Sequence, residues 1–155
     1  MSASSLLTID ALIDSNVIIA ALAADHEHHL PSADLFDTAR ALTLGIAAHS
    51  YAEAYSTLTR IGPHAPFSFT AEEAWAALES MRAVTRLIGL TPAQTFETVR
   101  SYATSGGIGS RLYDRMIGET AVVHGISCIV TWNIGHMRGL FPTLDVQTPD
   151  DFVRA

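Results

Sequence analysis

Acidic residues stand at three points of the sequence where a predicted strand ends or a predicted helix begins. Asp14 closes a short apolar run, and Glu53 lies in the first turn of the helix expected after a second run. Asp114 lies in the first turn of another expected helix, and a fourth polar group, Asn133 to His136, follows a later apolar run. Carboxylates can hold a divalent cation, which lowers the pKa of the water it binds. Metal-assisted hydrolysis is therefore one chemistry open to these residues.

The segments between these groups alternate between strand and helix patterns. Apolar runs of strand length occur at residues 8–13, 42–48, 83–90, 126–131 and 144–146. Helical spacing or capping signals occur at residues 15–22, 32–41, 50–61, from 71 onward, 92–103 and 111–124. Strands that alternate with helices predict a parallel sheet covered on both faces. Ligands of such sheets bind beyond the carboxyl ends of the strands, so we expect the polar groups at one edge.

Two of the acidic residues also have purely structural interpretations. Asp14 could serve only as the cap of the helix that follows it, a role that Ser15 could fill equally well. Glu53 has the spacing of a capping box with Ser50, in which the two side chains satisfy free backbone N–H groups. Taken alone, the capping interpretation of Glu53 is slightly favoured.

The other candidate residues have similar alternatives. Asp114 could complement the dipole at its helix N-terminus, Asn133 could be a turn residue, and His136 could be an ordinary surface histidine. What favours a common site is coincidence, because these separate features would all fall on one edge of one sheet.

Local signals mark several helix boundaries. Thr70 with Glu73, and Thr91 with Gln94, have the spacing of capping boxes. Gly125 is expected to end the helix that precedes it, since glycine readily adopts the backbone conformation that stops a helix.

Three further segments have a predicted role. The helix 111–124 carries apolar residues on nearly every side and is expected to be central. The histidine-rich stretch 25–31 is interpreted as a solvated loop, because adjacent side chains in a loop rarely converge on a metal. The glycine-rich stretch 105–110 lacks the Gly-Lys-Ser/Thr ending of a phosphate-binding loop and is interpreted as a connector.

The bulk composition predicts one domain over residues 1–155 with a sizeable core. Hydrophobic residues make up 48% of the chain, and mean hydropathy is +0.25. The formal net charge of -7 argues against a protein that binds nucleic acid by neutralising phosphates. It does not argue against a nuclease, because carboxylates that hold a cation contribute to that charge.

The single cysteine and the apolar runs restrict the compartment. Cys128 lies within an apolar run and is expected to be a packed, unreactive thiol, which excludes an internal disulfide. The N-terminus lacks the positive start of a signal peptide, and the longest apolar stretch, Val17 to Ala24, is too short to span a bilayer. A cytoplasmic protein without a membrane partner is expected.

Four segments, in this order, resemble the PIN-domain ribonucleases, and most closely the VapC-like toxins of toxin–antitoxin pairs. The segments are Ile13–Ile18, Ala48–Glu53 running on to Arg60, Leu112–Asp114 and Val130–Asn133. The resemblance implies a PIN-like three-layer α/β/α sandwich with a central, mainly parallel sheet. It also implies an endoribonuclease that depends on Mg²⁺ or Mn²⁺, acts on RNA, forms a homodimer and is inhibited by a cognate VapB-like antitoxin.

The resemblance also assigns roles to individual residues. Asp14, Glu53 and Asp114 fall on the acidic, catalytic metal-binding positions of the family. His136 occupies a position where many members carry a further acid, and imidazole can also bind Mn²⁺, so it is the fourth candidate ligand. Polar neighbours would orient the ligands or the substrate: Ser15, Asn16, Thr131 and Asn133.

Two other functions are compatible with parts of the pattern. The histidine at position 136 and the acidic net charge keep open a catalytically weak PIN-like module that binds RNA or a protein partner. A phosphoacceptor domain of receiver type needs a lysine near its acids, and the chain has no lysine.

Apolar residues such as Phe67, Phe69 and Trp75 are expected to expose a patch that a partner covers.

Overall fold

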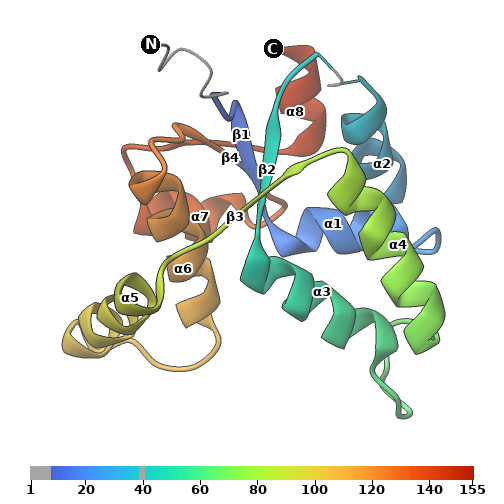
Figure 1. Ribbon diagram of the computed structural model, residues 1–155, viewed down its shortest axis with the longest axis horizontal. Helices are drawn as coiled ribbons and strands as arrows, with labels where there is room; N and C mark the ends of the chain where they lie inside the picture. The colour runs from blue at the N-terminus through green and yellow to red at the C-terminus, as the bar shows by residue number, and fades with distance from the viewer. Residues whose placement is uncertain (1–7, 39–40) are drawn as a thin grey trace.

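One five-stranded parallel sheet forms the centre of the structure (Figure 1). The computed structural model describes residues 8–38 and 41–155. The strand order is β3-β2-β1-β4-β5, and every neighbouring pair is parallel. The strands are β1 (Ala11–Ile13), β2 (Leu44–Ala47), β3 (Arg86–Ile88), β4 (Cys128–Val130) and β5 (Asp145–Gln147).

The first strand is central because its side chains are apolar on both faces. All three residues of β1 are fully buried, and Leu12 pairs with Gly45 of β2 on one side and Ile129 of β4 on the other. Strands buried on both faces are expected as short continuous apolar runs. At the edge of the sheet, Arg86 and Leu87 of β3 are exposed.

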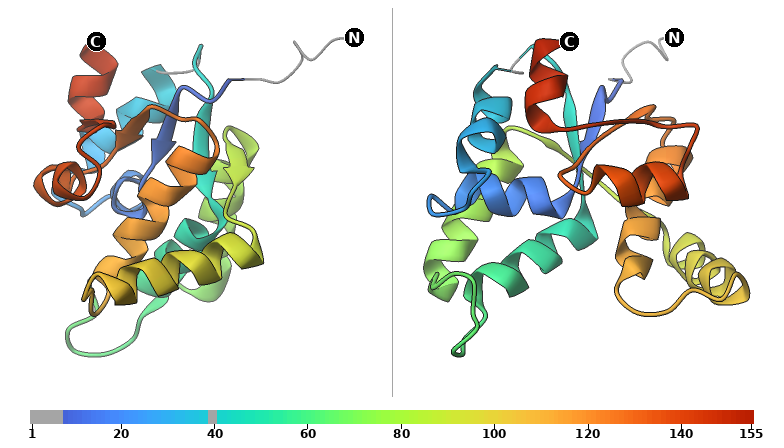
Figure 2. Two further views of the ribbon diagram at one scale, coloured as in Figure 1. Left: turned by 90° about the vertical axis from the view of Figure 1, so that its left-hand side faces the viewer. Right: turned by 180° about the vertical axis from the view of Figure 1, so that it is seen from behind.

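Helices cover both faces of the sheet, so that two cores result (Figures 1 and 2). The helices in the described residues are α1 (Ser15–Leu22), α2 (His29–Thr38), α3 (Ala48–Thr59), α4 (Ala71–Ala83), α5 (Pro92–Thr104), α6 (Arg111–Val123), α7 (Ile134–Leu140) and α8 (Pro149–Arg154). Alternate residues of β1 point to opposite cores: Ala11 and Ile13 pack with α1, α2 and α4, whereas Leu12 packs with α6 and α7. The predicted three-layer α/β/α sandwich is confirmed.

The predicted helix boundaries at α4, α5 and α6 are confirmed. Thr70 accepts a hydrogen bond from the N–H of Glu73 and Thr91 from that of Gln94, and both capping boxes are reciprocal. Gly125, with φ +67°, follows the end of α6. These caps satisfy backbone donors that an uncapped helix leaves free.

The expectation that the helix 111–124 is central is wrong. Ile117 and Ala121 of α6 are buried, but Tyr113, Val122 and Val123 on its other side are exposed. The helix covers one face of the sheet, so only one side of it meets a core, although apolar residues occur all round. Apolar composition alone does not show which sides have neighbours.

Several elements differ from their predicted extent. The short helices α7 and α8 were not expected, although Thr148 caps α8 and Pro149 begins it. The helix α2 begins at His29, three residues before the predicted start. Short helices give too few turns for a clear apolar period, which is why the sequence pattern misses them.

Cys128 is buried as predicted. Burial, with a smaller contribution from Asp145, raises the pKa of its thiol to about 12, so it is not a nucleophile near neutral pH. Across the part of the chain that the structure describes, no helix has both the length and the apolar character needed to cross a membrane.

The contact between α6 and the residue after α7 gives a test of the packing. A Cβ atom on Gly118 would lie 1.9 Å from the ring of Phe141. We expect Gly118→Ala to lower the free energy of unfolding by about 1–3 kcal/mol, because overpacking outweighs the better helix propensity of alanine. Chemical denaturation measures the change.

Gly139→Ala in α7 is the matched control, since among the described residues its added Cβ has no neighbour within 4 Å apart from the local backbone of its own helix and the adjacent residues. It should leave the free energy of unfolding unchanged or raise it slightly. A Gly118→Ala protein as stable as wild type would contradict the close packing of α6 on Phe141.

Candidate functional site

Asp14 is a buried carboxylate at the junction of β1 and α1. It is the N-cap of α1, and only 3% of its surface is exposed. Its Oδ1 accepts a hydrogen bond from the N–H of Ser15 (2.7 Å), and its Oδ2 accepts one from the hydroxyl of Thr131 (2.9 Å). Burial raises the pKa of Asp14 to about 6, and the charge of Asp114 contributes, although the bond from Thr131 opposes the shift.

Polar side chains that follow β4 and start α1 hold Asp14 in place. The Asn16 amide donates to Thr131 Oγ1 (3.0 Å), and the N–H of Trp132 donates to Asn16 Oδ1 (3.0 Å). The N–H of Asn133 also donates to Thr131 Oγ1 (3.0 Å). A hydroxyl has one donor and two acceptor positions, so Thr131 is fully satisfied while it donates to Asp14.

Asp114 and His136 form a second cluster, in the first turns of α6 and α7. His136 Nδ1 lies 2.7 Å from Asp114 Oδ2, and the Asn133 amide lies within 3.5 Å of both groups. The two side chains are about one-fifth exposed. The structure therefore places His136 against one of the three candidate acids, where it occupies an oxygen of that acid.

Glu53 is the third candidate acid and lies on α3. Burial raises the pKa of Glu53 to about 7, the charges of Asp14 and Asp114 add to the shift, and a hydrogen bond with the Ser15 side chain opposes it. These charge effects show that Asp14 and Asp114 lie within electrostatic reach of Glu53, although the three acids come from α3, α6 and the end of β1.

The capping interpretation of Glu53 is wrong. The helix α3 begins at Ala48, directly after β2, so Glu53 lies in its second turn. Ser50 is fully buried inside the helix and its hydroxyl has no hydrogen-bond partner among the described residues. The strand ends one residue earlier than the sequence pattern indicated, and the helix begins two residues earlier.

One residue of the site, His49, was missed by the sequence analysis. Its Nε2 lies 3.7 Å from Glu53 Oε1, and its imidazole hydrogen-bonds to the backbone of Tyr113, next to Asp114. Burial lowers the pKa of His49. The spacing of four residues between His49 and Glu53 puts them on one face of a helix, and this signal could have found the pair.

The donor set fits a hard divalent cation. Carboxylate oxygens are the ligands that Mg²⁺ and Mn²⁺ prefer, and Mg²⁺ often uses only one or two of them besides water. Besides burial, the charge of Asp114 raises the pKa of Asp14, and the charges of Asp14 and Asp114 raise the pKa of Glu53, so a bound cation would offset this repulsion. Within residues 8–38 and 41–155, however, no three His, Cys, Asp or Glu side chains stand ready-made as a metal-binding group.

The histidine-rich stretch 25–31 does not converge on one point. His26 Nδ1 accepts a hydrogen bond from the N–H of His28, and His29 Nδ1 lies 2.9 Å from the carbonyl of Ala20. The ring of His28 stacks on Trp132 with centroids 3.9 Å apart. The three imidazoles therefore have separate partners.

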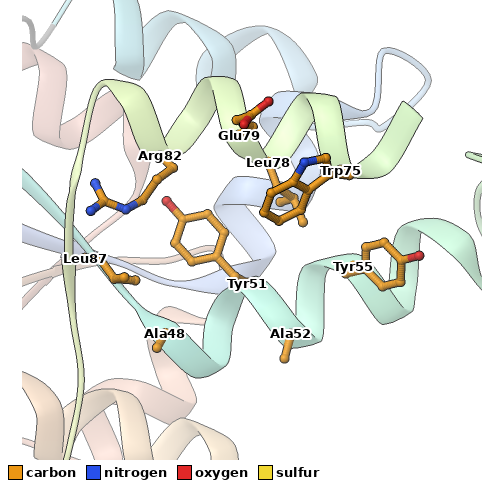
Figure 3. A pocket seen from close by; sticks show the side chains of 9 residues that line it. All are labelled: Ala48, Tyr51, Ala52, Tyr55, Trp75, Leu78, Glu79, Arg82 and Leu87. Carbon is orange, nitrogen blue, oxygen red and sulfur yellow. The ribbon is translucent and has the colours of Figure 1, made fainter. Parts of the chain in front are cut away.

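A groove of about 610 Å³ lies between α3 and α4, on a different face of α3 from Glu53 (Figure 3). Trp75, 61% exposed, lines it, so the expected exposure of this residue is confirmed. Phe67 and Phe69 instead pack partly buried against a small third core. The groove is lined by Ala48, Tyr51, Ala52, Tyr55, Trp75, Leu78, Glu79, Arg82 and Leu87.

The family follows from the sequence as a whole. The model of the PIN domain family matches residues 11–135, which include Asp14, Glu53, Asp114 and Asn133. The chain belongs to the PIN domain family. None of the curated protein sequences compared with the chain matches it significantly.

Within that family, the fold is that of the VapC toxins. The DNA-bound VapBC complex of Salmonella typhimurium is similar over 92% of this chain and 99% of that chain, at 18% identity and a TM-score of 0.66. VapBC2 from Rickettsia felis, bound to a promoter DNA fragment, is similar over 90% of this chain and 98% of that chain, at 17% identity and a TM-score of 0.63. Mycobacterium tuberculosis VapC20, a sarcin-ricin loop cleaving toxin, is similar over 77% of this chain and 87% of that chain, at 16% identity and a TM-score of 0.61. At these identities the likeness shows a shared fold.

The raised pKa values make the stability of the metal-free protein depend on pH. The folded state binds protons at Asp14 and Glu53 more tightly than the unfolded state does, so stability should fall as pH rises from 5 to 8. The contribution of Asp14 is on the order of 2 kcal/mol. Thermal unfolding across this pH range, in the presence of a chelator, measures the slope.

The Asp14→Asn variant is the control for this slope, because an amide does not titrate. It should unfold at a higher temperature than wild type at pH 8 and show a shallower fall between pH 5 and 8. An unchanged slope would mean that Asp14 titrates with an ordinary pKa.

Proposed function

We propose that residues 1–155 act as one PIN domain that cleaves RNA as a metal-dependent endoribonuclease and serves as the toxin of a VapBC-type pair. The observation that carries the proposal is the gathering of Asp14, Glu53 and Asp114 at the carboxyl edge of the sheet, where burial and neighbouring negative charges raise the pKa of Asp14 and of Glu53. Clustered negative charge in a largely buried place is unfavourable unless a cation offsets it.

The metal ligands in this proposal are Asp14, Glu53 and Asp114, with His136 as the fourth. Bound Mg²⁺ or Mn²⁺ would neutralise charge on the phosphoryl oxygens and supply hydroxide near neutral pH. Ser15, Asn16 and Thr131 fix the orientation of Asp14 through the hydrogen bonds described above.

Asn133 and His136 restrain the second half of the site. Both lie within hydrogen-bond distance of Asp114 Oδ2 and so limit the directions in which this carboxylate can turn. In this proposal His136 would release that oxygen to the cation and bind the cation itself.

The proposed partners are a cognate VapB-like antitoxin and a second copy of the chain, in the cytoplasm. Several of the similar structures are VapBC complexes, which supports an antitoxin. The exposed Trp75 in the α3–α4 groove is apolar surface that a protein partner could cover, and its fluorescence would report the contact.

A catalytically weak module that binds RNA or a partner is the second candidate. The observation in its favour is the 2.7 Å contact between His136 and Asp114, which occupies a carboxylate oxygen, while the described residues contain no ready-made metal-binding group. Cleavage of RNA by the purified protein with Mn²⁺, suppressed by EDTA, would exclude this candidate.

Neutralising either of two acids should abolish cleavage. We expect Asp14→Asn and Asp114→Asn each to lower the cleavage rate with Mn²⁺ by at least about a hundredfold, since each removes charge from the cation site. Both proteins should remain folded, with unfolding temperatures equal to or above that of wild type. Cleavage of a labelled RNA pool, with and without EDTA, measures the effect.

Asp151→Asn is the control for these variants, because Asp151 is an exposed acid in the first turn of α8. It should cleave like wild type. Near-normal cleavage by Asp14→Asn or Asp114→Asn would show that the proposed site is not the one that acts.

The Glu53→Gln variant tests whether Glu53 is a metal ligand. The amide keeps the size of the side chain but removes the charge, so Mn²⁺ affinity measured by titration calorimetry should fall about tenfold or more. The unfolding temperature should not fall, since a carboxylate with a raised pKa is lost. Glu79→Gln, in the separate groove, should bind Mn²⁺ normally; wild-type affinity in Glu53→Gln would remove Glu53 from the site.

A further inference from the structure

His49 is a largely buried histidine beside the candidate acids. It lies on α3 one turn before Glu53, and its side chain is 19% exposed. Its Nε2 atom is buried and has no hydrogen-bond partner among the described residues, and at 3.7 Å it is too far from Glu53 Oε1 for a hydrogen bond. A buried nitrogen without a partner destabilises the fold, so His49 is not explained by stability.

The same imidazole reaches the helix that carries Asp114. It hydrogen-bonds to the backbone of Tyr113, and the two rings stack at 6.5 Å with an interplanar angle of 25°. Tyr113 immediately precedes Asp114 in the first turn of α6. His49 thus contacts Glu53 on its own helix and the residue beside Asp114 on another.

The two helices need such a connection because their other packing partners differ. The helix α3 packs against α1 and α4, whereas α6 packs against α5, α7 and β4. Figure 1 shows α3 running from the lower end of β2 toward the right, whereas α6 lies on the other side and runs upward beside the sheet. The separation of Glu53 and Asp114 is therefore sensitive to the few contacts that join these helices.

We propose that His49 is a positioning residue of the acidic site, which ties α3 to the first turn of α6 and so sets the separation of Glu53 and Asp114. The inference rests on the proposed function. His49 does this without occupying an oxygen of Glu53, in contrast to His136, which lies 2.7 Å from Asp114 Oδ2. Proteins depart from good packing mainly at functional sites, so a buried Nε2 atom without a hydrogen-bond partner is expected beside such a site.

Two substitutions separate positioning from packing. His49→Leu fills the space but cannot bind the Tyr113 backbone, and His49→Gln keeps a donor that can reach it. The control is His124→Leu, because His124 Nε2 lies 2.8 Å from the carbonyl of Gly89 at the exposed far end of α6. For each protein, we would measure thermal unfolding without metal, Mn²⁺ affinity by titration calorimetry, and kcat and KM for RNA at saturating Mn²⁺.

In His49→Leu, stability and metal binding should move in opposite directions. The unfolding temperature should equal or exceed that of wild type, since the buried nitrogen is gone, while Mn²⁺ affinity falls about ten- to a hundredfold. The kcat should fall more than KM rises. His49→Gln should recover part of the affinity, and His124→Leu should bind Mn²⁺ like wild type.

Two results would overturn the inference. Wild-type Mn²⁺ affinity and kcat in His49→Leu would show that His49 does not set the separation of Glu53 and Asp114. A parallel loss of stability and Mn²⁺ affinity, without rescue in His49→Gln, would show that His49 contributes only to packing. If His49→Leu fails to fold, the comparison of His49→Gln with His49→Ala decides by the same titration. A wild-type protein that binds Mn²⁺ without cleaving RNA would refute the nuclease and still test His49; no Mn²⁺ binding would refute both.

Discussion

The bond between Thr131 and Asp14 is the interaction on which the arrangement depends. It joins the residue after β4 to the residue after β1, and both side chains are almost fully buried. An ionised carboxylate there is unfavourable unless several donors point at it, and the start of α1 supplies the rest through Ser15 and Asn16. The adjacency of β1 and β4, strands more than a hundred residues apart, is thus coupled to the chemistry of one side chain.

The strand order makes the same edge available to the other acids. With β1 between β2 and β4, the helix that leaves β2 carries Glu53 past Asp14, and the chain that leaves β4 carries His136 back to Asp114. The apolar cores on the two faces of the sheet stabilise the fold and so offset the repulsion between these acids. The acids share one edge because the carboxyl ends of parallel strands meet there.

The sequence was sufficient for features that depend on neighbouring residues. Capping boxes at Thr70 and Thr91 need only local spacing, and short apolar runs identified every strand of the described sheet, with bounds that differ by at most three residues. It was insufficient where a distant element decides. The exposed side of α6 and the contact of His136 with Asp114 depend on what packs beside them, and the start of α3 depends on where the ladder of β2 stops.

The helix α3 presents three separate faces to three surroundings. Ser50, Ala54 and Leu58 are buried, His49 and Glu53 face the acids, and another set of residues lines the α3–α4 groove. Because successive residues of a helix are 100° apart, the acidic face and the groove face are formed by different residues. A substitution on the groove face can therefore change that surface while the acidic face keeps its residues, although any tilt of the helix moves both faces together.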